Sequence, residues 1–185
     1  ESEAHYRSLI NTSPDGIALT DSAGRVTYAS PRMFTLFGVP PETPVLGRSV
    51  LEWIAPEERE QAGQAIRELL VNKQPGQPKE FRVLKGDGSL FWVEICSTPL
   101  LDAQGEVSGM MSILRDITAR KQTEARLAQQ AALLDNANDA MLVRDLEHRI
   151  VYWNKAAERL YGWSAAEVLG QRLIERIFCD LERFE

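Results

Sequence analysis

The side chains best suited to chemistry are two histidines and two cysteines, and they lie far apart in the sequence. The histidines are His5 and His148, and the cysteines are Cys96 and Cys179. A metal site needs three or four such ligands, and a catalytic triad needs a nucleophile, a base and an orienting group that can meet. We therefore predict no metal centre and no catalytic residue, and two reduced thiols rather than a disulfide framework.

Charge and hydropathy argue against several partners. The net charge is −6 and the isoelectric point is near 5.1, whereas nucleic-acid surfaces are usually basic. No apolar run approaches the roughly 18 residues of a membrane-spanning helix, and the acidic start Glu1–Glu3 does not resemble a signal peptide. We expect no nucleic acid and no direct membrane contact. The expected location is cytoplasmic, with any membrane anchor of the whole protein lying elsewhere.

These residues must be positioned by a series of short elements. Alternating apolar residues bounded by turn clusters predict five strands, at 17–20, 25–29, 79–85, 89–100 and 106–116. Apolar residues at helical spacing predict helices, at 4–11, 31–37, 42–46, 49–54 and 56–72. Ser30 is expected to cap the helix that follows it, because its hydroxyl can accept from free N–H groups. The pattern favours an α+β fold with one five-stranded antiparallel sheet flanked by short helices.

Strand alternation assigns one set of side chains to the interior of this fold. The set is nearly all apolar, with three small hydroxyls, and three helix residues face the same way. The expected cavity-lining residues are Ala18, Thr20, Met33, Phe37, Ile66, Phe81, Val83, Val93, Ile95, Ser97, Met110, Ser112 and Leu114. Two alternatives stay open: an interior filled by its own side chains, or a cavity that binds a small apolar ligand.

The opposite face of the same strands carries a second apolar set. The outward residues are Ile17, Leu19, Trp92, Cys96 and Met111. An exposed apolar surface of this extent needs a cover. We expect the cover to be the entry helix, through Tyr6, Leu9 and Ile10, or a second subunit.

The chain contains an internal repeat. Residues 9–54 align with residues 133–177, with twelve identities in the same order. Between the copies, residues 118–134 contain no Gly or Pro, and Leu127, Ala131 and Leu134 recur at helical spacing, which predicts a helical connector able to pair with its own copy. The predicted organisation is a complete domain at 1–117, a connector at 118–134 with Thr118 as its cap, and the N-terminal half of a second domain at 135–185.

The joint order of several motifs resembles the PAS sensory family with its PAC tail. These motifs are the "SPDGI" start, the "VLG" turn, the "DGSLFWVEICSTPL" strand and the "RDIT" end. The resemblance covers residues 4–118 as a whole domain and residues 133–185 as half of one. It implies a tandem PAS fragment of a bacterial- or archaeal-type sensor protein, such as a sensory-box histidine kinase.

The resemblance also defines what cofactors to look for. Haem-binding members use a His on the long helix, and residues 56–72 contain none. Members that form a covalent flavin adduct use a Cys after the "VLG" turn, and residues 48–53 contain none. Trp53 and Trp92 could stack on a ring, although Trp92 is expected to face outward. We therefore expect no cofactor and argue against haem and a flavin adduct, with non-covalent FAD or a small apolar ligand as open alternatives.

The resemblance implies a non-catalytic sensory and signal-relay module. A change in the cavity or in dimer packing is expected to pass through Asp116, Ile117 and Thr118 to the connector helix. The expected partners are a second copy, through the sheet face and the connector, and a downstream kinase or cyclase domain of the same chain. The alternatives are a ligand-free dimerisation module and a small-ligand sensor upstream of a cyclic-dinucleotide output domain.

Overall fold

The computed structural model describes residues 10–135 and 137–172, and the chain divides into two compact units between Lys121 and Gln122. Residues 10–12 are helical. Most of the predicted entry helix, including Tyr6 and Leu9, lies outside the described residues.

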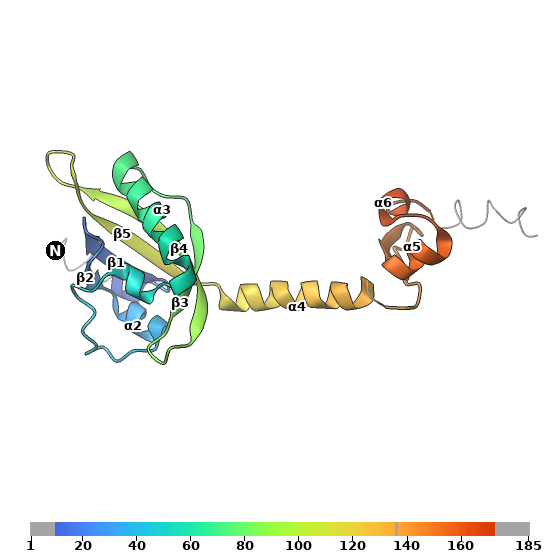
Figure 1. Cartoon of the computed structure of the whole chain (residues 1–185), viewed down its shortest axis with the longest axis horizontal. Helices are drawn as coiled ribbons and strands as arrows, with labels where there is room; N and C mark the ends of the chain where they lie inside the picture. The colour runs from blue at the N-terminus through green and yellow to red at the C-terminus, as the bar shows by residue number, and fades with distance from the viewer. Residues whose placement is uncertain (1–9, 136, 173–185) are drawn as a thin grey trace, which may run out of the picture. The chain divides into compact units, whose positions relative to one another are not determined.

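The first unit is built on the predicted five-stranded antiparallel sheet. Its order is β2-β1-β5-β4-β3, which places the last strand of the unit at the centre (Figure 1). The strands are β1 Gly16–Asp21, β2 Val26–Ala29, β3 Lys79–Leu84, β4 Leu90–Leu101 and β5 Val107–Asp116. The α+β class and the strand order along the chain are as the sequence predicted.

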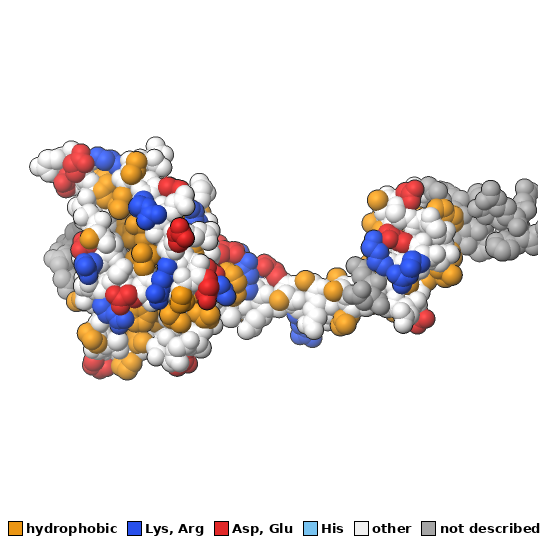
Figure 2. Space-filling view, in the orientation of Figure 1, with side chains coloured by type: hydrophobic (Ala, Val, Ile, Leu, Met, Phe, Trp, Pro, Cys, Tyr) orange, Lys and Arg blue, Asp and Glu red, His pale blue; other side chains and the backbone are white. Residues whose placement is uncertain are grey.

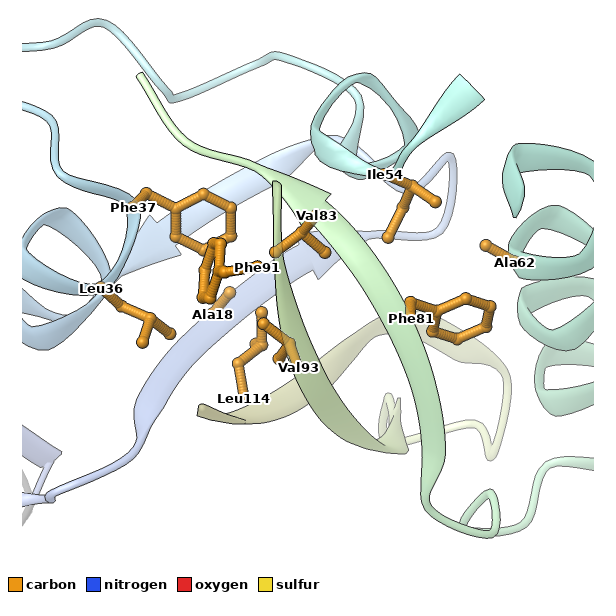
Figure 3. Close-up of a cluster of buried hydrophobic side chains, with 10 residues drawn as sticks. All are labelled: Ala18, Leu36, Phe37, Ile54, Ala62, Phe81, Val83, Phe91, Val93 and Leu114. Atoms are coloured by element: carbon orange, nitrogen blue, oxygen red, sulfur yellow. The ribbon is translucent and has the colours of Figure 1, made fainter. Parts of the chain in front are cut away.

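Short helices pack on one face of this sheet. They are α2 Pro31–Phe37, η1 Val50–Trp53, η2 Pro56–Glu58 and α3 Arg59–Asn72. Leu36 and Phe37 of α2 join Ala18, Phe81 and Val93 of the strands in one buried cluster (Figure 3). The helices therefore cover the face that strand alternation assigned to the interior.

Residues 42–46 are not helical, contrary to the prediction. They form turns, with Thr43 N–H donating to the carbonyl of Pro40. Pro44 has no N–H to donate within a helix. The second unit has Glu167 at the matching position and forms the helix α6 Ala165–Val168 there.

Ser30 is the N-cap residue of α2, but its hydroxyl does not accept from the free N–H groups of the helix, contrary to the prediction. Its hydroxyl instead accepts from the backbone N–H of Ile17 at 3.0 Å, and its own N–H donates to the carbonyl of Ile17 at 2.8 Å. Ser30 is fully buried between β1 and α2. Its side chain thus connects β1 to the start of α2, a contact that the in-and-out alternation of strand side chains does not predict.

The second unit repeats the first two strands and the helix after them. Its elements are β6 Leu142–Arg144, β7 Ile150–Trp153, α5 Lys155–Tyr161 and α6. Ile150, Trp153, Ala157 and Val168 form its small buried core.

Three of the residues repeated between the copies make the same contacts in both units. Arg149 donates through Nη1 to the carbonyl of Gly170 at 3.1 Å, and its N–H donates to Asp145 Oδ1 at 2.7 Å. The first unit reproduces both contacts with Asp21, Arg25 and Gly47. The repeated residues therefore make the same connection in each unit, between the turn of the first two strands (β1–β2 or β6–β7) and the "VLG" turn.

Gly109 in β5 tests the packing at the centre of the sheet. A Cβ atom at this position would collide with the backbone carbonyl of Thr20 in β1. We expect Gly109→Ala to lower the free energy of unfolding by about 1–3 kcal/mol, as overpacking usually does. Urea denaturation measures the effect. The control is Gly63→Ala in α3, where a Cβ has room, 3.4 Å from the flexible end of Arg67; it should leave stability unchanged or raise it. Equal effects would contradict the close approach.

Candidate functional site

The helices and the sheet enclose a cavity of about 480 Å³. This volume lies within the range of roughly 300–1,000 Å³ that is typical of ligand pockets. The predicted residues found at its wall are Ala18, Met33, Phe37, Ile66, Phe81, Val83, Ile95, Ser97, Met110, Ser112 and Leu114. The interior is therefore not completely filled by its own side chains.

Two predicted lining residues, Thr20 and Val93, do not reach the cavity wall. Val93 is completely buried and lies beside Leu114 in the packed cluster (Figure 3). Thr20 is 3% exposed, and its hydroxyl has no hydrogen-bond partner among the described residues. Its strand neighbours Val26 and Met110 do line the cavity.

Aromatic side chains form one part of the wall. The ring of Phe37 meets Trp53 and Phe91 edge-on, at centroid distances of 5.3 Å and 5.5 Å. The guanidinium of Arg48 lies 4.8 Å from the centroid of Trp53 on a face of the indole. These contacts hold Trp53 in place, so a ring in the cavity would meet a preformed aromatic surface.

A pair of hydroxyls provides polarity on the sheet side of the wall. Ser97 of β4 and Ser112 of β5 face each other in register, with 2.8 Å between their Oγ atoms. Because the two hydroxyls satisfy each other, they are buried without an obvious cost. Each retains further hydrogen-bonding capacity for a ligand group.

Sequence reasoning missed the polar part of the wall, which runs from the end of α3 to the start of β3. These residues are Glu68, Asn72, Gln74, Gln77 and Lys79. Two signals were available. Glu68 and Asn72 follow Ala65 at helical spacing, and Lys79 precedes Phe81 and Val83 at the strand period of two.

The outer face of the sheet carries the predicted apolar set. Ile17, Leu19, Trp92, Cys96 and Met111 are all half-buried. The register places Ile113 of β5 between Ile17 and Cys96, so Ile113 belongs to the same surface although the prediction omitted it.

The junction between β5 and helix α4 (Thr118–Asp135) is tied to β4 by hydrogen bonds. The N–H of Ile117 donates to the carbonyl of Trp92 at 3.0 Å, and the N–H of Trp92 donates to Thr118 Oγ1 at 3.1 Å. Asp116 Oδ1 accepts from the N–H of Thr118 at 2.8 Å. Asp116, rather than Thr118 as predicted, therefore satisfies the free N–H at the helix start.

Opposite charges hold the first turn of α4 against the outer face of the sheet. Glu80 of β3 pairs with Arg120 at 2.6 Å and with Lys121 at 2.5 Å. The Lys121 ammonium also lies 5.3 Å from the centroid of Trp92. The hydrogen bond from Lys121 and the two nearby positive charges lower the pKa of Glu80 from its ordinary value of 4.5.

The last turn of α4 belongs to the second unit, where the side chain of Asn154 contacts it. Asn154 is completely buried and donates through its amide to the carbonyls of Leu134 and Asp139, both at 3.0 Å. Its Oδ1 accepts from the N–H groups of Met141, at 2.8 Å, and Ala157, at 2.9 Å. Asn154 caps α5, and it also binds the last turn of α4, which the sequence did not indicate.

Neither a metal centre nor a membrane span is found within the described ranges. Residues 10–135 and 137–172 contain no group of three His, Cys, Asp or Glu side chains that could hold a metal ion. No helix in the same ranges combines the length and the apolar character needed to cross a membrane.

Comparison with known proteins supports the fold. A family model described as the PAS fold matches residues 4–117 and 128–184. The crystal structure of a PAS domain from Colwellia psychrerythraea is similar, with a TM-score of 0.59 and 24% identity, over 64% of this chain and 99% of that one.

Two curated proteins illustrate the relatives. "Probable diguanylate cyclase DgcE" of Escherichia coli K12 is 31% identical over 77% of this chain. "Sensor protein FixL" of Bradyrhizobium diazoefficiens is 29% identical over 75% of it. The chain spans only 13% and 28%, respectively, of the length of these proteins.

The pairing of Glu80 with α4 predicts a pH-dependent contribution to stability. Because folding lowers the pKa of Glu80, its ion pairs stabilise the fold above the unfolded-state value and cease to do so as the pH falls below 4.5 through the lowered pKa. We expect Glu80→Gln to lower the free energy of unfolding at neutral pH. The difference from the wild type should shrink as the solution becomes more acidic. Urea denaturation over a pH series measures it.

The control for this prediction is Glu42→Gln. Glu42 is exposed and has no ion-pair partner within 4.0 Å among the described residues. Its substitution should not change stability at any pH in the series. A Glu80→Gln difference that is absent at neutral pH, or that grows on acidification, would contradict the assignment.

Proposed function

This chain belongs to the PAS fold family, and from that premise we propose that its first unit senses a small ligand in the cavity and relays the bound state to α4. It is a PAS sensory module of the kind found in signalling proteins such as histidine kinases and diguanylate cyclases. The PAS unit itself is a non-catalytic module.

One observation supports the relay above all. Met110, Ser112 and Leu114 line the cavity at alternate positions of β5. The same strand continues through Asp116 and Ile117 directly into α4. A ligand that displaces these three side chains therefore acts on the strand that begins the helix, with no flexible loop between them. This connectivity supports the relay. A relay also needs two alternative states of the protein for which the ligand has different affinities.

The chemistry of the wall favours a ligand held without a covalent bond. The described residues that line the cavity include no His and no Cys, so none of them can ligate haem iron through an imidazole or form a thiol adduct. The aromatic and aliphatic wall suits a small, largely apolar molecule. Non-covalent FAD is the alternative ligand, and a visible spectrum of the purified protein distinguishes the two.

The proposed output of the whole protein is a sensor histidine kinase, and a diguanylate cyclase is the alternative. Both types occur among the relatives, in DgcE as a probable cyclase and in the "Sensor histidine kinase TmoS" of Ectopseudomonas mendocina, which is 28% identical over 69% of this chain.

Filling the cavity tests the sensing half of the proposal. Ala65 on α3 lines the cavity, so Ala65→Trp should lower the amount of co-purifying ligand by at least about tenfold. The ligand is measured by mass spectrometry and absorption after extraction. Val71→Trp is the control, because Val71 is on the same helix but 78% exposed; it should retain the ligand. Circular dichroism verifies that both variants fold. A wild-type protein that yields no ligand and binds none from a small-molecule library would contradict sensing.

Interrupting the junction tests the relay half. Replacing Thr118 by Pro–Gly in the whole protein removes the hydroxyl that accepts from Trp92 and breaks the start of α4. Regulation of the output should be lost while the ligand content stays unchanged. Unchanged regulation would contradict the relay.

A second candidate function is dimerisation through α4, which one observation favours. Leu127 is 61% exposed and Leu134 is 43% exposed, and apolar side chains are visible along α4 in Figure 2. These two leucines are one heptad apart, so a second copy of the same helix can bury both of them.

Leu127→Glu tests this dimer. The added charges would face each other across the paired helices, so the dissociation constant of the dimer should rise at least about tenfold. Light scattering over a concentration series measures it. Gln129→Glu adds the same charge on another side of α4 and should have little effect. A wild type that is monomeric at every concentration would contradict dimerisation through α4.

A further inference from the structure

The cavity separates apolar from polar wall residues. The interior of the wall is formed by aromatic and aliphatic side chains such as Phe37, Trp53 and Ile54. Glu68, Asn72, Gln74 and Gln77 also line the cavity but are exposed to solvent, and Lys79 is half-exposed. Residues that contact both the cavity and the solvent mark its opening. The opening therefore lies between the last turns of α3 and the first residue of β3.

Two of the described lining residues are charged, and both are at this opening. They are Glu68 and Lys79, whose side chains approach to 3.8 Å. Glu68 is also bound by a second partner, because the side-chain amide of Gln64 donates to its Oε1 at 2.9 Å. For the Lys79 ammonium, the one ion-pair partner within 4.0 Å among the described residues is this long contact with Glu68. An ammonium has three donors, so Lys79 has capacity for a better-placed anion.

The two parts of the wall restrict the ligand in different ways. A charged group placed among the apolar residues would lose its hydration without compensation, which is costly. The same group at the opening keeps contact with water and meets the donors of Lys79 and the amide groups of Asn72, Gln74 and Gln77. The apolar body of the ligand must then fill the interior.

We propose that the cavity binds an amphipathic monocarboxylate, with its apolar body inside and its carboxylate at Lys79. This inference rests on the proposed function, since it names the class of ligand that the sensor takes. Lys79 acts as the specificity residue, because its ammonium pairs with the carboxylate of the ligand. The carboxylate of Glu68 repels the ligand carboxylate, so Glu68 must move away from Lys79 when the ligand binds. The ion pair of Glu68 and Lys79 is thus exchanged for a new one on binding.

The experiment compares two probes of equal chain length, decanoate and decan-1-ol, by isothermal titration calorimetry with the full chain. Lys79→Met keeps the apolar stem but removes the charge, and it should weaken decanoate binding about tenfold, as expected for a partly exposed charge-assisted hydrogen bond. Glu68→Gln should strengthen it. Binding of decan-1-ol should change less than about twofold in both variants.

Two controls separate binding inside the cavity from binding elsewhere on the chain. Arg67→Met removes a positive charge from an exposed part of α3 that does not line the cavity, and it should leave decanoate binding unchanged. Ala65→Trp fills the interior and should abolish binding of both probes. Decanoate that still binds to Ala65→Trp would be bound outside the cavity and would overturn the inference.

The failure of this inference and the failure of the proposed function give different results. If decanoate and decan-1-ol bind alike and Lys79→Met affects neither, the cavity binds ligands but does not select a carboxylate. If neither probe binds while extraction yields another ligand, the monocarboxylate class is wrong and sensing stands. If neither probe binds and no ligand is extracted or found, the sensing function itself is wrong.

Discussion

The antiparallel pairing of β5 with both of its neighbours is the constraint on which the rest of the first unit depends. Because of this pairing, β5 contributes to three parts of the unit at once. Its inward side chains line the cavity, its outward side chains form part of the apolar outer face, and its end continues into α4. A strand paired on both sides cannot shift alone, because every residue is joined to β1 or β4 by ladder hydrogen bonds. The cavity wall and the start of α4 therefore belong to one continuous hydrogen-bonded sheet.

The size of the cavity explains why an occupant is physically reasonable. Burial of apolar surface is worth roughly 25 cal/mol per Å². A ligand with an apolar body would gain this energy against the wall, because it makes close contacts with Phe37, Trp53 and their neighbours that water cannot make.

Equivalent positions of the two units carry different residues, which form different hydrogen bonds. Ser30 and Asn154 occupy equivalent places after the second strand, and both are completely buried. The short hydroxyl of Ser30 reaches only Ile17, whereas the longer amide of Asn154 reaches four backbone groups, including the last turn of α4. The second unit therefore binds the end of α4 by a contact that has no counterpart among the described residues of the first unit. Helix α4 is thus anchored at its start by Glu80 and Trp92 and at its end by Asn154.

The sequence alone determined most of the elements, residues 42–46 excepted, and the direction of most side chains, because both depend on local periodicity. A period of two along β5 is enough to assign Met110, Ser112 and Leu114 to one face and Met111 to the other. Only the tertiary structure decided which inward residues reach the cavity, since that depends on what packs in front of them, as the burial of Val93 shows. It also decided the partners of Ser30, Asp116 and Thr118. A hydroxyl or carboxylate binds whichever backbone group the fold brings within about 3 Å, and no local pattern encodes that distance.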